Sequence, residues 1–267
     1  MNTIVDWDQD TSQWSEICAA AAGCGAGAEP SGNGLWPIYG PLLRIPRDQS
    51  FVIAQIGQSL DGRVATPTGR SHYINGKAAL VHLHRLRALV DAIVVGVGTV
   101  IADDPQLNVR LAQGPAGKSP PARVVLDPNG RIPAEARCLR DDGARRILVR
   151  GDAISGDSRH PDSGVEQMTL PMTAGGMAPH AVLAALGALG LRRILVEGGA
   201  NTVSRFLAAG CLHRLHVMVA PLIIGSGPPG VQLAPIDRLE GALRPTVTTF
   251  PLPGGDVLFD CEFAATA

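Results

Sequence analysis

Cysteines, aromatic residues and long apolar runs are scarce in this sequence, and each scarcity excludes a class of protein. The five cysteines include no CxxC pair and lack the close, even spacing of a disulfide scaffold, so we expect them to be reduced. No apolar run approaches the roughly 20 residues that a membrane-spanning helix requires. Asp6, Asp8 and Asp10 stand where a signal peptide would be basic. These features favour a cytoplasmic protein that enters no membrane.

An excess of charge of one sign is also lacking. The formal net charge is -1 and the basic residues are scattered singly, which gives no electrostatic reason to expect nucleic acid. An acidic ligand would therefore be bound by a few local arginines. Metal-ligand spacing is absent too, because His82 and His84 are two apart on a predicted helix and point to different faces. We interpret His213 and His216 as surface residues flanking a strand, and we expect no metal site.

The first part of the chain differs in composition from the rest. Residues 1–48 are rich in Ala, Gly and Pro and predict an N-terminal arm, with a short helix near residues 14–22 and a loop after it. Pro37, Pro41 and Pro46 predict an extended approach to the core. The remaining residues, 49–267, are long enough for one large domain with a substantial core.

From Phe51 onward, short apolar runs alternate with helical segments, which is typical of a mostly parallel sheet covered on both faces. A helix is predicted over residues 77–90 with Asn75 as its N-cap, and further helices follow Pro179 and Ala200. The last two strands should form an antiparallel hairpin at the sheet edge. The predicted strands cover residues 51–56, 92–95, 123–126, 146–149, 193–196, 215–219, 247–250 and 256–261.

Two glycine-containing turns follow predicted strands. In the first, a buried strand ends at Glu197 and is followed by Gly198, Gly199 and a helix start. Glycines permit a sharp turn and the free amides of a helix start attract phosphate, so this run suits a phosphate or dinucleotide cradle. A purely structural turn is an equally good interpretation. The second turn, Gly96–Thr99, has a simple helix cap as its alternative.

Three further features concern charged groups. Asp103 and Asp104 are adjacent carboxylates, which predicts polar recognition, although a turn opened by Asp-Pro is compatible with the same residues. We interpret Asp61-Gly62 as a structural turn. Arg87 lies outside the apolar stripe of its predicted helix, so we expect it to be free to point at an anion.

The order and spacing of several motifs resemble a known family, the reductase domain of riboflavin biosynthesis. This domain is the pyrimidine reductase branch of the dihydrofolate-reductase-like superfamily, and the resemblance covers roughly residues 50–262. The motifs are Ser59–Arg63, Ser71–Ile74, Leu86–Ala88, Asp91–Val100 and Asp103–Arg110.

The resemblance implies a three-layer α/β fold with a mostly parallel sheet, NADPH as cofactor and a homodimer. The apolar region 215–224 and the C-terminal strands would supply an edge for the dimer. Bifunctional relatives carry a zinc deaminase domain with H-x-E and P-C-x-x-C signatures, which this sequence lacks, so we expect no deamination.

The resemblance also implies roles for single residues. Tyr73 stands where many relatives have tryptophan, and Asn75 replaces a commoner threonine; a planar tyrosine can still stack on a ring. The implied substrate ligands are Ser71, Arg87, Leu107, Arg110 and Glu197, with Ser71, Arg87 and Arg110 forming a phosphate clamp. The implied cofactor ligands are Gln58, Tyr73, Gly96, Thr99, Asp103, Gly199, Ala200, Asn201, Thr202 and Arg205.

The leading hypothesis is an NADPH-dependent reductase that converts the ribosyl group of a phosphoribosylaminopyrimidine to ribityl. Glu197 is the first candidate for substrate recognition and proton handling and Asp103 the second, although a carboxylate at a strand end also serves as a brace. Arg150, just past a strand, is a candidate ligand for the 2′-phosphate, with a solvent-exposed arginine as the alternative. Two other hypotheses remain: a pterin, folate or other ring reductase on the same scaffold, and a non-catalytic NADPH-binding protein.

Overall fold

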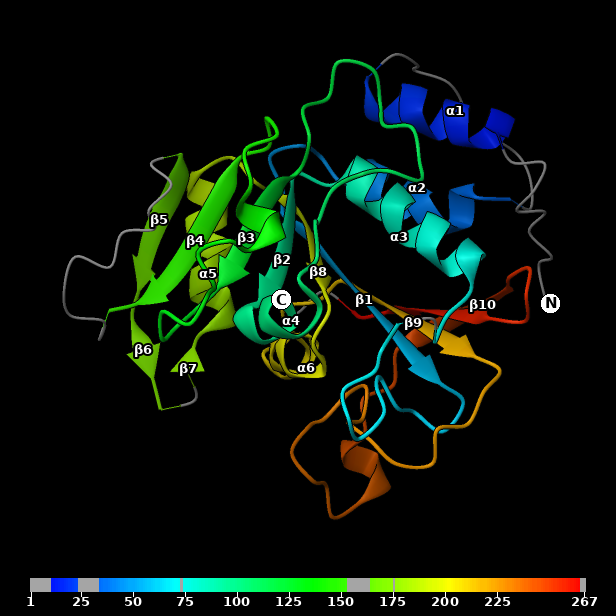
Figure 1. Cartoon of the computed structure of the whole chain (residues 1–267). Helices are drawn as coiled ribbons and strands as arrows, with labels where there is room; N and C mark the ends of the chain where they lie inside the picture. Colours follow the sequence, from blue (N-terminus) through cyan, green and yellow to red (C-terminus); the bar gives the residue numbers. More distant parts are fainter. Residues whose placement is uncertain (1–10, 24–33, 73, 153–163, 175, 265–267) are drawn as a thin grey trace.

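The structure is a computed structural model that describes residues 11–23, 34–72, 74–152, 164–174 and 176–264. A nine-stranded sheet runs through this described part, and seven of its strands are parallel neighbours (Figure 1). In spatial order the strands are β10 (Thr246–Pro251), β11 (Val257–Glu262), β9 (Arg214–Ala220), β1 (Phe51–Ser59), β8 (Arg193–Glu197), β2 (Ala92–Gly96), β3 (Ala122–Leu126), β4 (Arg146–Gly151) and β5 (Val165–Leu170). A separate small hairpin joins β6 (Met172–Thr173) to β7 (Gly176–Met177).

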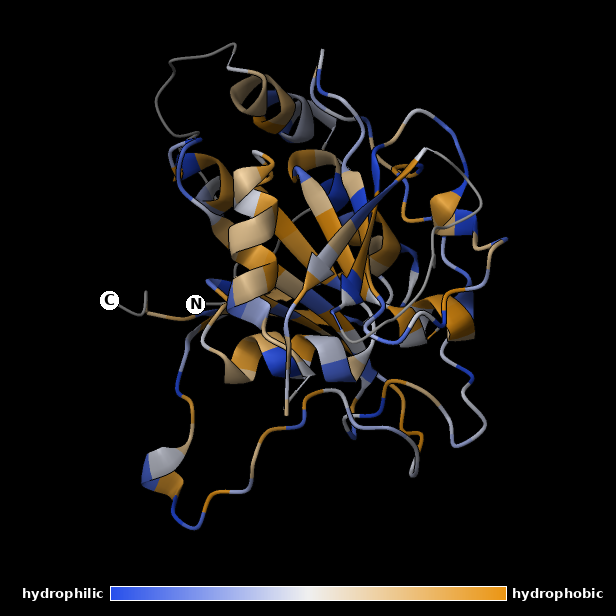
Figure 2. Cartoon of the chain, turned by 90° about the vertical axis from the view of Figure 1, so that its left-hand side faces the viewer, coloured by the Kyte–Doolittle hydropathy of each residue, from blue (hydrophilic) through white to orange (hydrophobic). Residues whose placement is uncertain are grey.

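Helices cover both faces of the sheet. Successive side chains along a strand point to opposite faces of the sheet and so to two separate cores. In β1, Phe51 and Ile53 belong to the first core, and Val52 and Ala54 to the second. Figure 2 shows the apolar strands enclosed by helices. The first core is covered by α1 (Thr11–Ala21), α2 (Trp36–Arg44) and α3 (Lys77–Leu89), and the second by α5 (Pro179–Ala188) and α6 (Ala200–Ala208). Three short helices are α4 (Val97–Asp103), η1 (Arg137–Leu139) and η2 (Leu239–Gly241).

The predicted three-layer α/β architecture is confirmed. Each predicted strand is present within a few residues of its expected bounds, and β10 and β11 form the expected antiparallel hairpin. The sequence pattern missed β5, whose alternating exposed residues belong to the outer strand of the parallel sheet, and it did not identify α4 as a helix. Strand β9 is not an edge, because it pairs with β1 on one side and β11 on the other. The edge lies on β10, one of the C-terminal strands that were expected to supply it.

Two local predictions on the approach to the sheet are wrong. The prolines at 37 and 41 do not keep the chain extended; both lie inside α2. Pro37 is in the first turn, where its missing N–H costs nothing, and Ile38, Tyr39 and Leu42 are buried in the first core. Asn75 is also not the N-cap of α3, because Gly76 occupies that position and no side chain caps the helix. The Asn75 amide instead donates to the Met218 carbonyl oxygen, 3.3 Å away.

Helices α1 and α2 contribute Trp14, Ile17, Ile38 and Leu42 to the same core that supports the sheet. Helices α1 and α2 therefore share their core with α3 and lie on the same face of the sheet (Figure 1). The division of the chain into an arm over 1–48 and a domain over 49–267 stays a prediction.

A chain of buried polar groups links these layers. The Tyr39 hydroxyl lies 2.8 Å from His82 Nδ1, and His82 Nε2 lies 3.0 Å from His216 Nδ1. On its other side, His216 Nε2 is 3.2 Å from an Asp260 carboxylate oxygen. The surface interpretation of His216 is therefore wrong, and burial holds the pKa of His82 well below its ordinary value. His213 is half-buried and its ring stacks on Phe51.

Within the described residues, none of the helices is both long and apolar enough to cross a membrane. In the same part of the chain, His, Cys, Asp and Glu nowhere gather in a group of three or more that could hold a metal ion.

Candidate functional site

A cavity of about 1210 Å³ opens at the carboxyl ends of the parallel strands. Gln55 and Gly57 of β1, Gly96 of β2, Leu126 of β3 and Gly198 after β8 all contribute to its wall. The carboxyl ends of parallel strands meet at one edge of a sheet, which is where open α/β sheets bind their ligands. The predicted site residues in the wall are Ser71, Arg87, Gly96, Thr99, Asp103, Arg110, Gly199, Ala200, Asn201, Thr202 and Arg205.

The two glycine turns interlock at the floor of the cavity. Gly198 and Gly199 have φ of 59° and 54°, a left-handed conformation that favours glycine. A Cβ at Gly199 would lie only 2.7 Å from Thr99 Oγ1, and one at Gly96 only 2.5 Å from Thr202 Oγ1. Each turn therefore requires glycine because the threonine of the other turn packs against it.

The amino end of α6 faces the cavity and has the character of an anion site. Its first residues, Ala200 and Asn201, are in the cavity wall, and in the described part of the chain their amides have no backbone acceptor. The positive end of the helix dipole adds to the attraction for phosphate. At Gly98, also in the wall, nothing lies within 4 Å of the position of a Cβ, so a ligand has room to approach the backbone.

Arg205, on the second turn of α6, is half-buried in the same wall. Its Nη2 donates to the Met177 carbonyl oxygen at 2.5 Å, which ties the helix to the small β6–β7 hairpin.

Arg87 and Glu197, both expected at the substrate, form a bidentate ion pair with each other. Arg87 Nε lies 2.7 Å from Glu197 Oε1, and Nη2 lies 2.5 Å from Oε2. The third guanidinium nitrogen donates to the Asn108 carbonyl oxygen at 3.0 Å. The side chains are only 8% and 5% exposed. The expectation that Arg87 is free to point at an anion is therefore wrong, because Glu197 occupies its guanidinium. Arg87 borders the cavity, and Glu197 does not.

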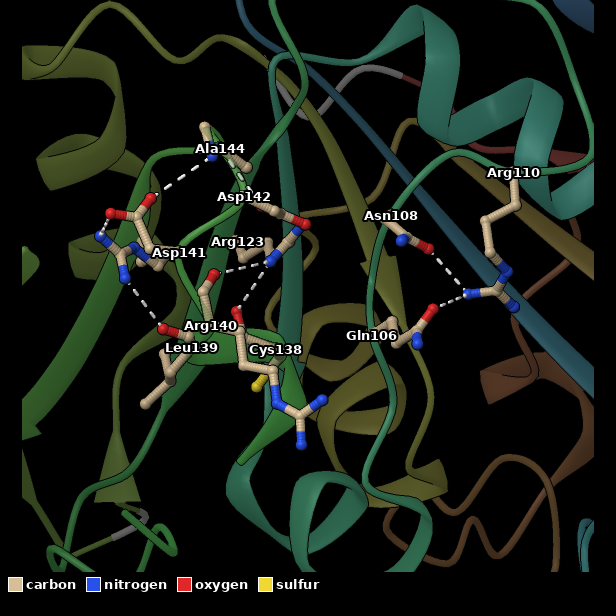
Figure 3. Close-up of polar contacts among 12 residues, drawn as sticks. Gln106, Asn108, Arg110, Arg123, Cys138, Leu139, Arg140, Asp141, Asp142 and Ala144 are labelled. Carbon is tan, nitrogen blue, oxygen red and sulfur yellow. Dashed lines mark hydrogen bonds and ion pairs between the residues drawn. The ribbon is translucent and has the colours of Figure 1, made fainter. Parts of the chain in front are cut away.

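The other members of the expected clamp reach the cavity from the segment after α4 and from the loop before α3. The Ser71 hydroxyl donates to Asp103 Oδ1 at 3.1 Å. Arg110 is exposed, and its Nη1 lies 2.8 Å from Gln106 Oε1 and 2.7 Å from Asn108 Oδ1 (Figure 3). These acceptors are neutral, so the guanidinium keeps its full positive charge beside the cavity.

The two adjacent carboxylates, Asp103 and Asp104, have different surroundings, which bear on the two interpretations of polar recognition and an Asp-Pro turn. Asp104 has φ of 38° and accepts the Arg137 amide at 2.8 Å, so it braces the turn before Pro105. Asp103 faces the cavity with Ser71. The Asp61-Gly62 turn is structural as expected, because Asp61 accepts the amides of Ile224 and Gly225. The hydrogen bond from the Ser59 hydroxyl, followed by those from the two amides, lowers the pKa of Asp61 to about 2.

Two further expected ligands, Leu107 and Gln58, are absent from the wall of the large cavity. Leu107 is buried in the first core with φ of 52°, and its side chain borders a second, smaller cavity of about 370 Å³. Gln58 lies beside Gly230. Tyr73 lies outside the described residues. The cofactor and substrate roles of these three residues stay predictions.

Other wall residues carried no motif in the sequence. Gln55 borders the cavity from the middle of β1. A single polar residue within a buried apolar strand is the sequence feature that could have identified it. Arg131 and Arg137 come from the connection between β3 and β4. The solvent-exposed interpretation of Arg150 is wrong, because its side chain is buried; it does not border the cavity, and its role as a 2′-phosphate ligand stays a prediction.

His84 holds the backbone of Arg110 in place. Its Nδ1 accepts the Arg110 amide at 3.0 Å, which requires this nitrogen to be unprotonated. Burial and the nearby charges of Arg87 and Arg110 lower the pKa of His84 to about 4 from its ordinary 6.5.

The lowered pKa predicts a loss of stability in acid. The unfolded chain takes up a proton at His84 below about pH 6.5 but the folded chain only near pH 4, so the free energy of unfolding should decrease as the pH falls through this window. His84→Asn keeps a neutral acceptor, and its unfolding free energy should decline less steeply between pH 6.5 and 4 in urea titrations. Identical slopes for the two proteins would contradict this assignment.

The interlocked turns predict energetic coupling between Thr99 and Gly199. Gly199→Ala should destabilise the protein more than Gly199→Ala in a Thr99→Ala background, with a coupling energy of roughly 0.5–3 kcal/mol, because the second change removes the colliding hydroxyl. Gly98→Ala is the matched control and should be nearly neutral, since its Cβ meets nothing. Additive losses in a double-mutant cycle of urea unfolding would show that the turns do not interlock.

Comparison with known proteins matches most of the chain to a family. Residues 50–248 match the family described as RibD C-terminal domain. The chain is 35% identical over 201 residues to the riboflavin biosynthesis protein RibD of Mycobacterium tuberculosis (strain ATCC 25618 / H37Rv), covering 75% of this chain and 50% of that protein. The chain thus spans about half the length of the RibD proteins it matches.

A second curated relative is shorter. The 2,5-diamino-6-ribosylamino-4(3H)-pyrimidinone 5′-phosphate reductase of Methanothermobacter thermautotrophicus is 35% identical over 179 residues, covering 66% of this chain and 79% of that protein. Among solved structures, a deaminase/5-amino-6-(5-phosphoribosylamino)uracil reductase from Thermotoga maritima superposes with a TM-score of 0.67 at 25% identity, covering 81% of this chain and 57% of that one.

Proposed function

The chain belongs to the RibD C-terminal domain family, and from that membership we propose that it is an NADPH-dependent reductase of riboflavin biosynthesis. Its substrate would be a phosphoribosylaminopyrimidine of the 5-amino-6-(5-phosphoribosylamino)uracil type, whose ribosyl group becomes ribityl. The observation that carries the proposal is that one cavity is bordered both by a helix amino end suited to phosphate and by the cationic side chain of Arg110.

The size of the cavity supports two ligands side by side. Sites for one small ligand usually measure about 300–1,000 Å³, and this cavity measures about 1210 Å³. Gly98, Ala200 and Asn201 border one part of it, and Ser71 and Arg110 border another. A dinucleotide in the first part would leave the second for a phosphorylated substrate.

On the cofactor side, the residues present fit a nicotinamide dinucleotide. The unpartnered amides of Ala200 and Asn201 would hold its phosphates, and Thr99 and Thr202 would border them from the two glycine turns. When bound, the reduced nicotinamide supplies the hydride that the substrate accepts. The chain itself then contributes mainly binding and orientation.

On the substrate side, Arg110 would bind the phosphate and Ser71 would assist it. Asp103 and Asp104 are the carboxylates of the described cavity wall, and Asp104 is occupied by the turn, so we assign proton handling first to Asp103. Glu197 would act through Arg87, whose guanidinium it orients at the cavity wall.

We also propose a twofold homodimer. The segment between β9 and β10 exposes apolar side chains, among them Ile223 at 73% and Leu239 at 75%, and β10 presents a free strand edge. Pairing would cover both features. We expect sedimentation velocity to give the mass of two chains at micromolar concentration, and a stable monomer there would contradict the proposal.

Arg110→Ala tests the reaction and the substrate side together. The wild-type chain should oxidise NADPH when given the phosphoribosylaminopyrimidine, followed by NADPH absorbance. The variant should raise KM for that substrate by roughly 10- to 100-fold, since a charge-assisted contact contributes about 1.5–3 kcal/mol, while Kd for NADPH stays unchanged. Arg140→Ala, an exposed arginine outside the cavity wall, is the control.

The outcomes separate the hypotheses. No oxidation by a wild-type chain that binds NADPH would favour a different ring substrate or a non-catalytic binding protein. An equal loss of affinity for cofactor and substrate in the Arg110 variant would contradict the proposed clamp.

A further inference from the structure

The turn that follows β3 is built rigidly around one buried carboxylate. Asp127 is fully buried, and its two oxygens accept the amides of Arg131 and Ile132, each at 2.9 Å. The Asp127 amide donates to the Val149 carbonyl oxygen at 2.8 Å, and the Gly130 amide returns to the Asp127 carbonyl oxygen. The backbone of Arg131 is therefore fixed at the carboxyl end of the sheet.

The side chain of Arg131 takes no part in this network. It is exposed and borders the large cavity, near Leu126 and Pro128 at the end of β3. Among the residues that the structure describes, its guanidinium makes no hydrogen bond or ion pair. The turn thus holds a free cation in place at the rim of the cavity.

The position of Arg131 along the sheet decides what it can meet. The strand order places β8 beside β2, β2 beside β3, and β3 beside β4. A dinucleotide whose phosphates lie at the turns after β8 and β2 therefore has one end directed toward β1 and the other toward β3. Because Arg110 and Ser71 occupy the substrate part, the nucleoside end falls to the side of β3.

The charge of the protein groups beside the nucleoside end decides between NAD, with a ribose 2′-hydroxyl, and NADP, with a 2′-phosphate. A carboxylate that accepts a ribose 2′-hydroxyl is typical of sites for NAD, whereas an arginine accommodates the 2′-phosphate of NADP. The single carboxylate of the turn, Asp127, is buried and occupied by two amides, so it cannot accept a hydroxyl from the cavity. The Arg205 guanidinium donates to the Met177 carbonyl oxygen and the Arg137 guanidinium to the Asp104 carbonyl oxygen, at 3.5 Å, whereas the Arg131 guanidinium has no such partner among the described residues.

We propose that Arg131 binds the 2′-phosphate of the dinucleotide and is the residue that selects NADPH over NADH. This inference rests on the proposed function and adds a specificity determinant to it. The interaction is a charge-assisted contact between a planar guanidinium and a phosphate, made by a side chain whose backbone is already ordered.

The test is a binding titration that does not depend on turnover. Kd for NADPH and NADH is measured with the wild-type chain, Arg131→Ala, Arg131→Lys and the control Arg140→Ala. Adenosine 2′,5′-bisphosphate and adenosine 5′-monophosphate serve as competitors that differ in the 2′-phosphate alone. Because the Arg131 guanidinium makes no hydrogen bond or ion pair with the described residues, Arg131→Ala should keep the melting temperature of the wild type.

We expect Arg131→Ala to weaken NADPH and the bisphosphate at least tenfold and to leave NADH and the monophosphate unchanged. Arg131→Lys should lie between the wild type and the alanine variant, and Arg140→Ala should match the wild type. Unchanged NADPH affinity in Arg131→Ala would overturn the proposal, as would an equal loss for both dinucleotides.

Two results with the wild type separate this inference from the proposed function. Equal affinity for NADH and NADPH would overturn the selection by Arg131 and leave the reductase proposal standing. Failure to bind either dinucleotide would overturn both.

Discussion

The bidentate ion pair between Arg87 and Glu197 is the interaction on which the proposed substrate side of the cavity depends. It joins α3, which covers one face of the sheet, to the end of β8 in the sheet itself. Arg87 Nη1 donates to the Asn108 carbonyl oxygen, and the Asn108 side-chain oxygen accepts a hydrogen bond from Arg110. Removing one partner of a buried pair leaves an uncompensated charge, which typically costs about 3–5 kcal/mol. The helix, the strand end and the segment after α4 are thus held by one side chain.

A second constraint acts on the proposed cofactor side of the cavity and is steric. The turns after β2 and β8 approach so closely that each glycine faces a threonine of the other turn. Electrostatic restraint at Arg87 and close packing at Thr99 together fix the two halves of the cavity relative to the sheet. Both constraints are local, and they operate in a protein whose formal net charge is only -1.

The parts of the fold that repeat a simple period could be predicted from the sequence. Strands such as Ala92–Gly96 are continuous apolar runs bounded by turn residues, and α3 has an apolar stripe at helical period. Contacts between distant polar residues have no period. The pairing of Arg87 with Glu197 spans 110 residues, and it is decided by how α3 packs on β8. The helical state of Trp36–Arg44 likewise depends on the tertiary burial of Ile38 and Leu42, which outweighs the proline content.

The same limit applies to the site. The glycine turns and the Asp103–Arg110 segment were recognisable because their spacing is distinctive, and most of their residues do border the cavity. Arg131 carries no such signal, since it follows a turn like many others and gains its position only from the buried Asp127. Leu107 shows the reverse case: its motif was visible and its side chain lies in the core, so its substrate role stays a prediction.

The buried chain from Tyr39 to Asp260 has a consequence for the order in which the protein can fold. Its links join residues separated by 43, 134 and 44 positions, and the last partner lies on β11. During synthesis α2 and α3 leave the ribosome long before β9 and β11, so His82 and His216 cannot complete their contacts until most of the chain has been made. The part of the first core beside β9 and β11 therefore closes last, after the rest of the chain has been made.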